Sequence, residues 1–91
     1  MTFPKRNGFY LNERKTQYYF LNDKIHREDG PAIETAAGYV GWYKHGLPHR
    51  LDGPAIKYSD GHLEWWYEGF CFKDCHSQEE FEKYIKLKAF W

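Results

Sequence analysis

Aromatic and aliphatic residues alternate with polar ones in three segments of this chain, and turn-forming residues flank each segment. Alternation with a period of two places every second side chain on the same side of an extended chain, so it indicates β-strands. The segments are rich in Tyr, Trp, Phe and Val, which favour strands. They span Thr16–Leu21, Tyr39–Lys44 and His62–Glu68. A shorter strand is predicted before each of them, at Phe9–Asn12, Ala32–Thr35 and Ala55–Ser59.

Gly, Asn, Asp and Ser gather between the predicted strands, where tight turns are needed. The clearest signal is Asp60-Gly61, because Gly accepts the positive φ of a hairpin turn. Longer turns are expected at Asn12–Lys15, Ala36–Gly38 and Ser59–Gly61. Shorter connections are expected at 22–24, 45–47 and 68–70. Consecutive strands then fold back on one another, and the pattern predicts an antiparallel meander of hairpins.

One seven-residue motif occurs twice, 23 positions apart. It spans His26–Ala32 and His49–Ala55, and the two copies differ at one position. The same offset aligns Tyr19 with Trp42 and with Trp65. A fixed period in this range is typical of repeat architectures. We therefore predict a single domain over residues 1–91, with a partial unit at 8–18, repeats at 19–41 and 42–64, a degenerate closing unit at 65–76 and a capping helix at 77–90.

The helix prediction rests on Ser77-Gln78-Glu79-Glu80, which has the form of a capping box. The Ser77 hydroxyl is expected to accept from the N–H of Glu80, and the Glu80 carboxylate to reach back to that of Ser77. Helical spacing of apolar residues continues to Ala89, and Phe90 and Trp91 close the chain. The predicted fold is mainly β with one C-terminal helix, which we expect to cover one aromatic face of the sheet.

Period-two alternation divides the rings of the long strands between two faces. Tyr19, Trp42 and Trp65 share one face. The other face carries Tyr18, Phe20, Tyr43 and Trp66. Most of these rings are expected in the core, because the chain is 21% aromatic and has few aliphatic residues with which to build one. A face left uncovered would mark an interface, so these four rings are candidate contacts for a partner.

The repeated motif has a functional and a structural interpretation. In the functional one, Arg27 and Arg50 grip phosphate or carboxylate, and His26 and His49 add pH-dependent donors. In the structural one, each Asp caps a turn, each Gly supplies an unusual φ, each Pro fixes the start of a strand, and each His donates to Asp or to a carbonyl. We favour the structural interpretation, since a catalytic site is not needed twice.

Composition excludes several function classes. Thirteen basic and thirteen acidic residues give no net charge, which argues against bulk electrostatic binding of nucleic acid. No nucleophile elbow, phosphate-binding loop or dinucleotide fingerprint is present, so we predict neither an enzyme nor a cofactor.

Cys71 and Cys75 are too few for a disulfide scaffold and lack the second ligand pair of a zinc site. Without an apolar run long enough to span a membrane, the expected location is cytoplasmic.

The 23-residue period, the aromatic strands and the Gly-punctuated hairpins resemble MORN-type repeats. The His-Arg-x-Asp-Gly-Pro-Ala version is similar to short repeat proteins frequent in tailed-phage and large-virus genomes, whose closing unit leads into a Ser-x-x-Glu-Phe helix like Ser77–Phe81. The resemblance covers about residues 8–82. The chain lacks the Tyr-x-Gly-x-Trp core of MORN repeats, so their membrane-tethering roles are not carried over. What the resemblance implies is an elongated antiparallel sheet that serves as an interaction scaffold, encoded by a phage and acting on a host factor.

The leading hypothesis is therefore a non-enzymatic protein-interaction module that contacts its partner through a sheet edge or an aromatic face. One alternative is a nucleotide or small-ligand sequestering protein for counter-defence, in which Arg27 and Arg50 point into one concave site. A second alternative is single-stranded nucleic-acid binding on the aromatic face, assisted by Lys5, Arg6, Arg14 and Lys15. Free edge strands also make self-association through the sheet an expected property.

Overall fold

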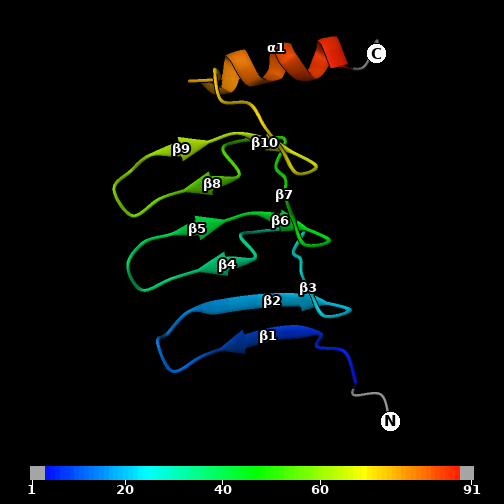
Figure 1. Cartoon of the computed structure of the whole chain (residues 1–91), viewed down its shortest axis with the longest axis vertical. Helices are drawn as coiled ribbons and strands as arrows, with labels where there is room; N and C mark the ends of the chain where they lie inside the picture. The colour runs from blue at the N-terminus through cyan, green and yellow to red at the C-terminus, as the bar shows by residue number, and fades with distance from the viewer. Residues whose placement is uncertain (1–3, 89–91) are drawn as a thin grey trace.

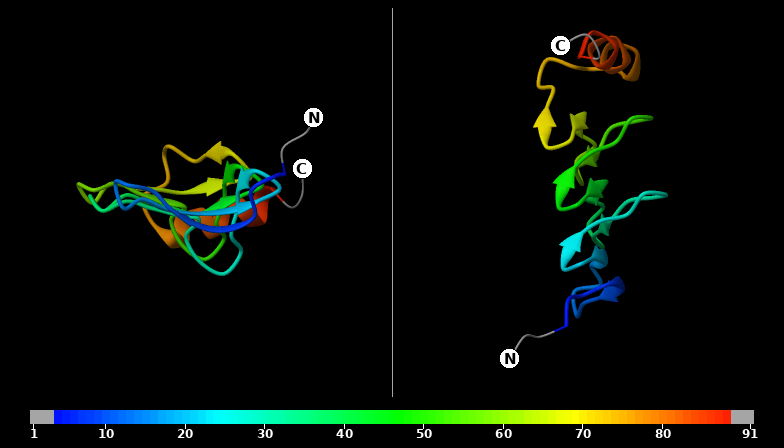
Figure 2. Two further views of the ribbon diagram at one scale, coloured as in Figure 1. Left: turned by 90° about the horizontal axis from the view of Figure 1, so that it is seen from below. Right: turned by 90° about the vertical axis from the view of Figure 1, so that its right-hand side faces the viewer.

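The computed structural model describes residues 4–88 and shows a mainly β molecule with one helix at its C-terminal end (Figure 1). The molecule is an elongated slab that measures 45 × 32 × 19 Å. Its strands lie one above another along the longest axis, and the helix lies across the far end (Figures 1 and 2). The predicted fold class, antiparallel strands with a C-terminal helix, is confirmed at this level.

Eleven strands and one helix make up the described part of the chain. They are β1 (Gly8–Leu11), β2 (Gln17–Leu21), β3 (Lys24–Ile25), β4 (Ile33–Glu34), β5 (Val40–Gly41), β6 (Tyr43–Lys44), β7 (Leu47–Pro48), β8 (Ile56–Lys57), β9 (Leu63–Glu64), β10 (Trp66–Tyr67), β11 (Phe70–Cys71) and α1 (Gln78–Lys88). The main sheet has the antiparallel order β1-β2-β4-β5-β8-β9, and β3 pairs with the end of β2. The hairpins β6-β7 and β10-β11 form separate two-stranded sheets.

Each long strand predicted from the sequence changes partners halfway along. The first half of β2 pairs with β4 and its second half with β3. In the next unit the same strand is interrupted at Trp42, which separates β5 from β6. The N–H of Trp42 donates to Ala55 in the main sheet, whereas its carbonyl accepts from His49 on the other side. The interruption is therefore the point at which the strand passes from the sheet to the side hairpin.

The short connections are two-residue hairpin turns. Both central residues have positive φ in each of them, which is the signature of a type I′ turn. The φ values are 49° and 69° at Asn22 and Asp23, and 50° and 81° at His45 and Gly46. In the last hairpin they are 45° at Glu68 and 86° at Gly69. The predicted hairpin connections are thus confirmed, and each is closed by two central residues.

Helix α1 begins after Ser77, whose Oγ accepts from the N–H of Glu80 at 3.2 Å, as the sequence predicts. The Glu80 carboxylate reaches the N–H of His76 at 3.4 Å. The predicted bond to Ser77 is therefore displaced by one residue. Ala89 and Phe90, the last two residues of the predicted helix, lie outside the described part of the chain.

The helix contacts Trp65, a ring of one predicted face, and so covers the last unit of that face rather than all of it. It packs across the end of the strand stack, where Phe81 is fully buried (Figure 1). Phe81 forms a small core with Trp65 and Cys75, and Phe72 packs against it with ring centroids 5.5 Å apart. The indole N–H of Trp65 donates to Gln78 at 2.9 Å, which ties the helix to the last unit.

Candidate functional site

The two repeated arginines lie flat on aromatic rings. The Cζ atom of Arg27 is 4.1 Å from the centroid of Tyr19, and that of Arg50 is 3.8 Å from the centroid of Trp42. Each ring lies eight positions earlier in the same unit, Tyr19 in β2 and Trp42 between β5 and β6. These are cation–π contacts, in which a planar guanidinium covers the face of the ring.

The remaining polar atoms of the motif secure the guanidinium. Nε donates to the carboxylate two residues on, at 3.0 Å from Arg27 to Asp29 and at 2.8 Å from Arg50 to Asp52. One terminal nitrogen of each arginine donates to the carbonyl of the motif proline at 3.3 Å. The predicted role of these carboxylates as caps of backbone N–H groups is corrected, because their partner is the arginine. The Arg50 guanidinium lowers the pKa of Asp52.

The motif glycines provide space for the arginine. A Cβ at Gly30 would lie 2.8 Å from Cζ of Arg27, and one at Gly53 would lie 2.7 Å from Cζ of Arg50. Neither glycine has a positive φ. The expected unusual φ is therefore wrong at both positions, and the absence of a side chain is what the corner requires.

The motif histidines connect one unit to the next. Nδ1 of His26 accepts from the backbone N–H of His45, and Nδ1 of His49 accepts from that of Glu68, both at 2.9 Å. The donors are the first residues of the following type I′ turns. The predicted donation from each histidine to Asp or to a carbonyl is corrected, because Nδ1 of each ring is a hydrogen-bond acceptor. In the first unit Oδ1 of Asn7 has the same role and accepts from the N–H of Asn22.

Burial lowers the pKa of His26, and the neighbouring His45 imidazole and Lys44 lower it further, against an opposing effect of Glu28. Burial also lowers the pKa of His49, with Lys44 acting in the same direction and Glu68 against it. A lowered pKa keeps the imidazole neutral, and a neutral ring leaves one nitrogen free to accept. The titration of both rings is thus coupled to the contact between units.

Three of the four predicted His/Arg candidates line one groove of about 380 Å³. They are Arg27, His49 and Arg50, and Lys44 lines the same groove. Glu28 and Asp52 also line the groove and offset part of its positive charge. His26 is not among its lining residues. The arrangement suits a small anion that accepts from guanidinium nitrogens not used in the corner.

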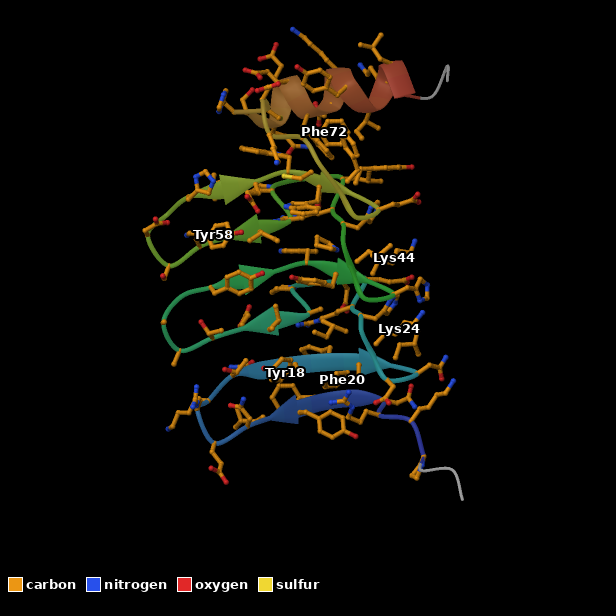
Figure 3. All side chains as sticks on the ribbon, viewed as in Figure 1. Tyr18, Phe20, Lys24, Lys44, Tyr58 and Phe72 are labelled. Atoms are coloured by element: carbon orange, nitrogen blue, oxygen red, sulfur yellow. The ribbon has the colours of Figure 1, made fainter. Side chains whose placement is uncertain are left out.

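The four candidate rings fall into two places. Tyr18 and Phe20 stack at 5.7 Å on β2, near the N-terminal end of the molecule (Figure 3). Arg6 lies over Phe20 at 4.2 Å. Together with Tyr10 and Ile25 they line a second groove, of about 560 Å³.

Tyr43 and Trp66 belong to a separate polar network. The Tyr43 hydroxyl lies 3.1 Å from that of Tyr39, while the indole N–H of Trp66 donates to Glu64 at 3.1 Å. Tyr58 donates to the same carboxylate at 2.9 Å. These contacts give both rings a structural role in the sheet, away from the Tyr18–Phe20 groove.

Strand β1 is the feature that sequence reasoning did not single out. All four of its residues are exposed, and Phe9, Tyr10 and Leu11 are 51%, 42% and 59% exposed. Within residues 4–88, β2 is the one strand that pairs with it. The signal in the sequence was the partial unit at 8–18, since its first strand pairs with the following strand, β2, and has no preceding strand among residues 4–88. This end of the stack is open, whereas the helix closes the other.

The cysteines are free thiols in the structure. Cys75 is buried, its Sγ lies 3.2 Å from the Ser77 carbonyl, and burial raises the pKa of both Cys71 and Cys75. Over residues 4–88, no three side chains of His, Cys, Asp or Glu are placed to hold a metal ion. In the same range no helix has the length and apolar character needed to cross a membrane.

Comparison with protein-family models, with curated proteins and with solved structures finds no match to this chain.

Proposed function

We propose that the protein is a non-enzymatic interaction module that docks another protein at its β1 end. One observation carries the proposal: the stack is closed at one end by α1 and open at the other, where three consecutive large apolar residues are exposed. An unpaired edge strand is a template for further pairing, and proteins normally blunt it with Lys, Pro or a cover. Gly8–Leu11 contains neither Lys nor Pro.

The energetics favour use of this surface. Fully burying a large apolar side chain stabilises by about 1.5–3 kcal/mol, so Phe9, Tyr10 and Leu11 can supply a substantial share of a docking energy. Strand pairing adds backbone hydrogen bonds to this. The corner motifs contribute by holding successive hairpins in line, which gives the open end a rigid base.

We extend the proposal to the class of the protein. The 23-residue recurrence of the arginine, glycine and histidine contacts supports a MORN-like hairpin repeat of the type found in phage and large-virus genomes. On that basis the partner is a bacterial host factor, met in the cytoplasm, and docking binds or inhibits it. Self-association through the sheet edge is the competing use of the same strand.

The test compares two substitutions at equally exposed positions. Leu11 on β1 and Leu87 on α1 are both 59% exposed, at opposite ends of the molecule. Leu11→Lys should abolish recovery of the partner by affinity capture from a host lysate, measured by mass spectrometry, while Leu87→Lys should leave recovery unchanged. Circular dichroism checks that both variants fold. Capture that survives Leu11→Lys, or that is lost with Leu87→Lys, would rule out docking at β1.

A second candidate function rests on the groove shared by Arg27 and Arg50. Two guanidiniums and Lys44 facing one space are compatible with capture of a nucleotide or another small anion. Calorimetry with nucleotides and cyclic nucleotides should then give heat that Lys44→Ala reduces. Absence of heat in the wild-type protein removes this candidate.

A further inference from the structure

We propose that the partner segment recognised at β1 is an extended strand that carries acidic residues, and that it adds to the sheet antiparallel or parallel beside β1. The inference rests on the proposed function and specifies the chemistry of its partner. It follows from the backbone of β1, from the groove beside it and from the charge of this end of the molecule.

The backbone of β1 is suited to receive a strand. It pairs with β2 in regular antiparallel register, from Gly8 opposite Phe20 to Leu11 opposite Gln17. A regular strand turns half of its N–H and carbonyl groups to each side, so the outer edge of β1 presents a ladder of the same spacing. Figure 1 shows β1 as the last strand at this end of the stack.

The groove beside β1 accepts apolar side chains. Half of the residues that line it are Tyr10, Tyr18, Phe20 and Ile25, and Tyr10 meets Phe20 edge to face at 5.3 Å. Figure 3 shows Tyr18 and Phe20 side by side on β2 at this end of the molecule. Because alternate side chains of an added strand point to the same face, every second residue of the partner can contact this groove.

The charge around β1 selects an acidic partner. Between residues 4 and 25 the chain has five Lys or Arg against two acids, and Asp23, one of those acids, is already paired with Arg6. Of the four other basic side chains, Lys24 belongs to β3, and Lys5, Arg14 and Lys15 are exposed and flank β1 on both sides. Acidic residues beside the partner strand would therefore be attracted at both ends of the pairing.

The same charges disfavour a second copy of this chain as the occupant. Edge-to-edge pairing of two β1 strands would bring one basic end against another, and like charges across an interface oppose association. Head-to-tail pairing would set this end against α1, whose sequence balances three Glu with three Lys. Neither arrangement offers the complementary charge that an acidic strand does.

The experiment uses three labelled peptides with the same alternating Thr-Val centre, flanked by Glu, by Ser or by Lys. Fluorescence polarisation with the full-length protein should show the Glu-flanked peptide binding about tenfold more tightly than the Lys-flanked one, a difference that shrinks in high salt. Arg14→Glu with Lys15→Glu should remove this preference. The matched control, Lys83→Glu with Lys86→Glu on α1, should retain it. Hydrogen exchange should slow at Gly8–Leu11 when the Glu-flanked peptide is bound.

The remaining outcomes overturn the inference in distinguishable ways. Equal affinity for all three peptides, with lysate capture still dependent on Leu11, rejects the acidic partner and leaves the proposed function standing. Protection of β1 without peptide, together with a dimer mass in light scattering, identifies a second copy as the occupant. Binding of oligothymidylate in preference to the Glu-flanked peptide identifies a nucleic-acid surface. If Leu11→Lys still captures the partner from the lysate, the docking site at β1 is itself rejected.

Discussion

The guanidinium of each repeated arginine is held by contacts of unequal strength. A cation over an aromatic ring contributes about 0.5–2 kcal/mol, and more where water is excluded. An ion pair with an exposed carboxylate contributes about 0–1 kcal/mol. The side chain of Asp52 is 78% exposed, whereas that of Arg50 is 25% exposed. Stacking on Trp42 therefore outweighs the ion pair in holding the corner.

We expect Arg50→Ala to lower the free energy of unfolding by about 2 kcal/mol, because the contact with Trp42 and the hydrogen bond to Pro54 are both lost. Asp52→Asn should cost less than about 1 kcal/mol, since its carboxylate is mostly in water. Urea denaturation followed by circular dichroism measures both. An equal loss of unfolding free energy in the two variants would contradict the conclusion that stacking on Trp42 outweighs the ion pair with Asp52.

A double-mutant cycle of Arg50→Ala and Gly53→Ala tests whether the glycine serves to leave space for the arginine. In the wild-type background, Gly53→Ala introduces a Cβ that displaces the guanidinium of Arg50. In the Arg50→Ala background that obstacle is absent, so the added cost of Gly53→Ala should fall. Additive costs would mean that the glycine serves some purpose other than space for the arginine.

The identity of the corner residues was visible in the sequence, but their roles were not. Repetition singles out Arg50, Asp52 and Gly53, because each recurs at the same offset. Their partners depend on folding: Trp42 lies between β5 and β6, and its face meets the arginine once the chain has turned back. Turn propensities describe neighbours in the chain, and so they favoured a backbone cap at Asp52 and an unusual φ at Gly53.

At the scale of the elements, side-chain acceptors join each hairpin to the next. His26 and His49 accept from the N–H groups of His45 and Glu68 through Nδ1, and a backbone hydrogen bond beside each of them completes the contact. Two-residue turns make this possible because both central residues adopt positive φ and project their N–H groups outward. Each hairpin is too short to be stable alone, so these junctions carry much of the cooperativity of the fold.

Because these contacts need neutral histidines, we expect the free energy of unfolding to fall in acid. The pKa of His26 and of His49 is lowered from the ordinary 6.5, so the unfolded chain binds these protons first. Their stabilising contribution is fully present above pH 6.5 and is lost as the pH falls through the lowered folded values. The free energy of unfolding, measured with urea at pH 7 and at pH 5, should be smaller at pH 5.

Asparagine supplies the control for the acid effect. Oδ1 of Asn7 already accepts from Asn22 in the first unit, at an atomic position equivalent to Nδ1 of histidine. His26→Asn with His49→Asn should therefore keep the acceptors while removing the titration, which flattens the dependence on pH. Substitution of the exposed His62 by Asn should leave the wild-type dependence intact. If the double substitution left the pH dependence of the unfolding free energy unchanged, His26 and His49 would not be its cause.

At the scale of the whole molecule, stability is built from units that contact their neighbours in sequence. The described residues contain few buried apolar side chains, and the cluster of Trp65, Cys75 and Phe81 lies at the helix end. Elsewhere the stack is held by ring contacts, arginine corners and histidine junctions. Such an arrangement is extendable, because each unit presents to the next the same surface that it receives.

Insertion of a second copy of residues 42–64 between Glu64 and Trp65 should therefore give a folded, longer protein. Two further strands at a spacing of about 4.8 Å add about 10 Å to the longest dimension, now 45 Å. Small-angle X-ray scattering measures this increase, and the urea midpoint should not fall. The control is the same 23 residues inserted in circularly permuted order, which breaks the register. Equal behaviour of the two insertions would contradict the repeat architecture.

The sequence by itself determined the period, the strands, the turns and the helix start, because alternation, turn chemistry and capping act between residues close together in the chain. It also marked the residues of the corners through their repetition. Tertiary structure alone decided which atoms these residues contact and where α1 lies. Those outcomes depend on how one hairpin is placed against the next, and that placement is set by contacts between units, which no local pattern encodes.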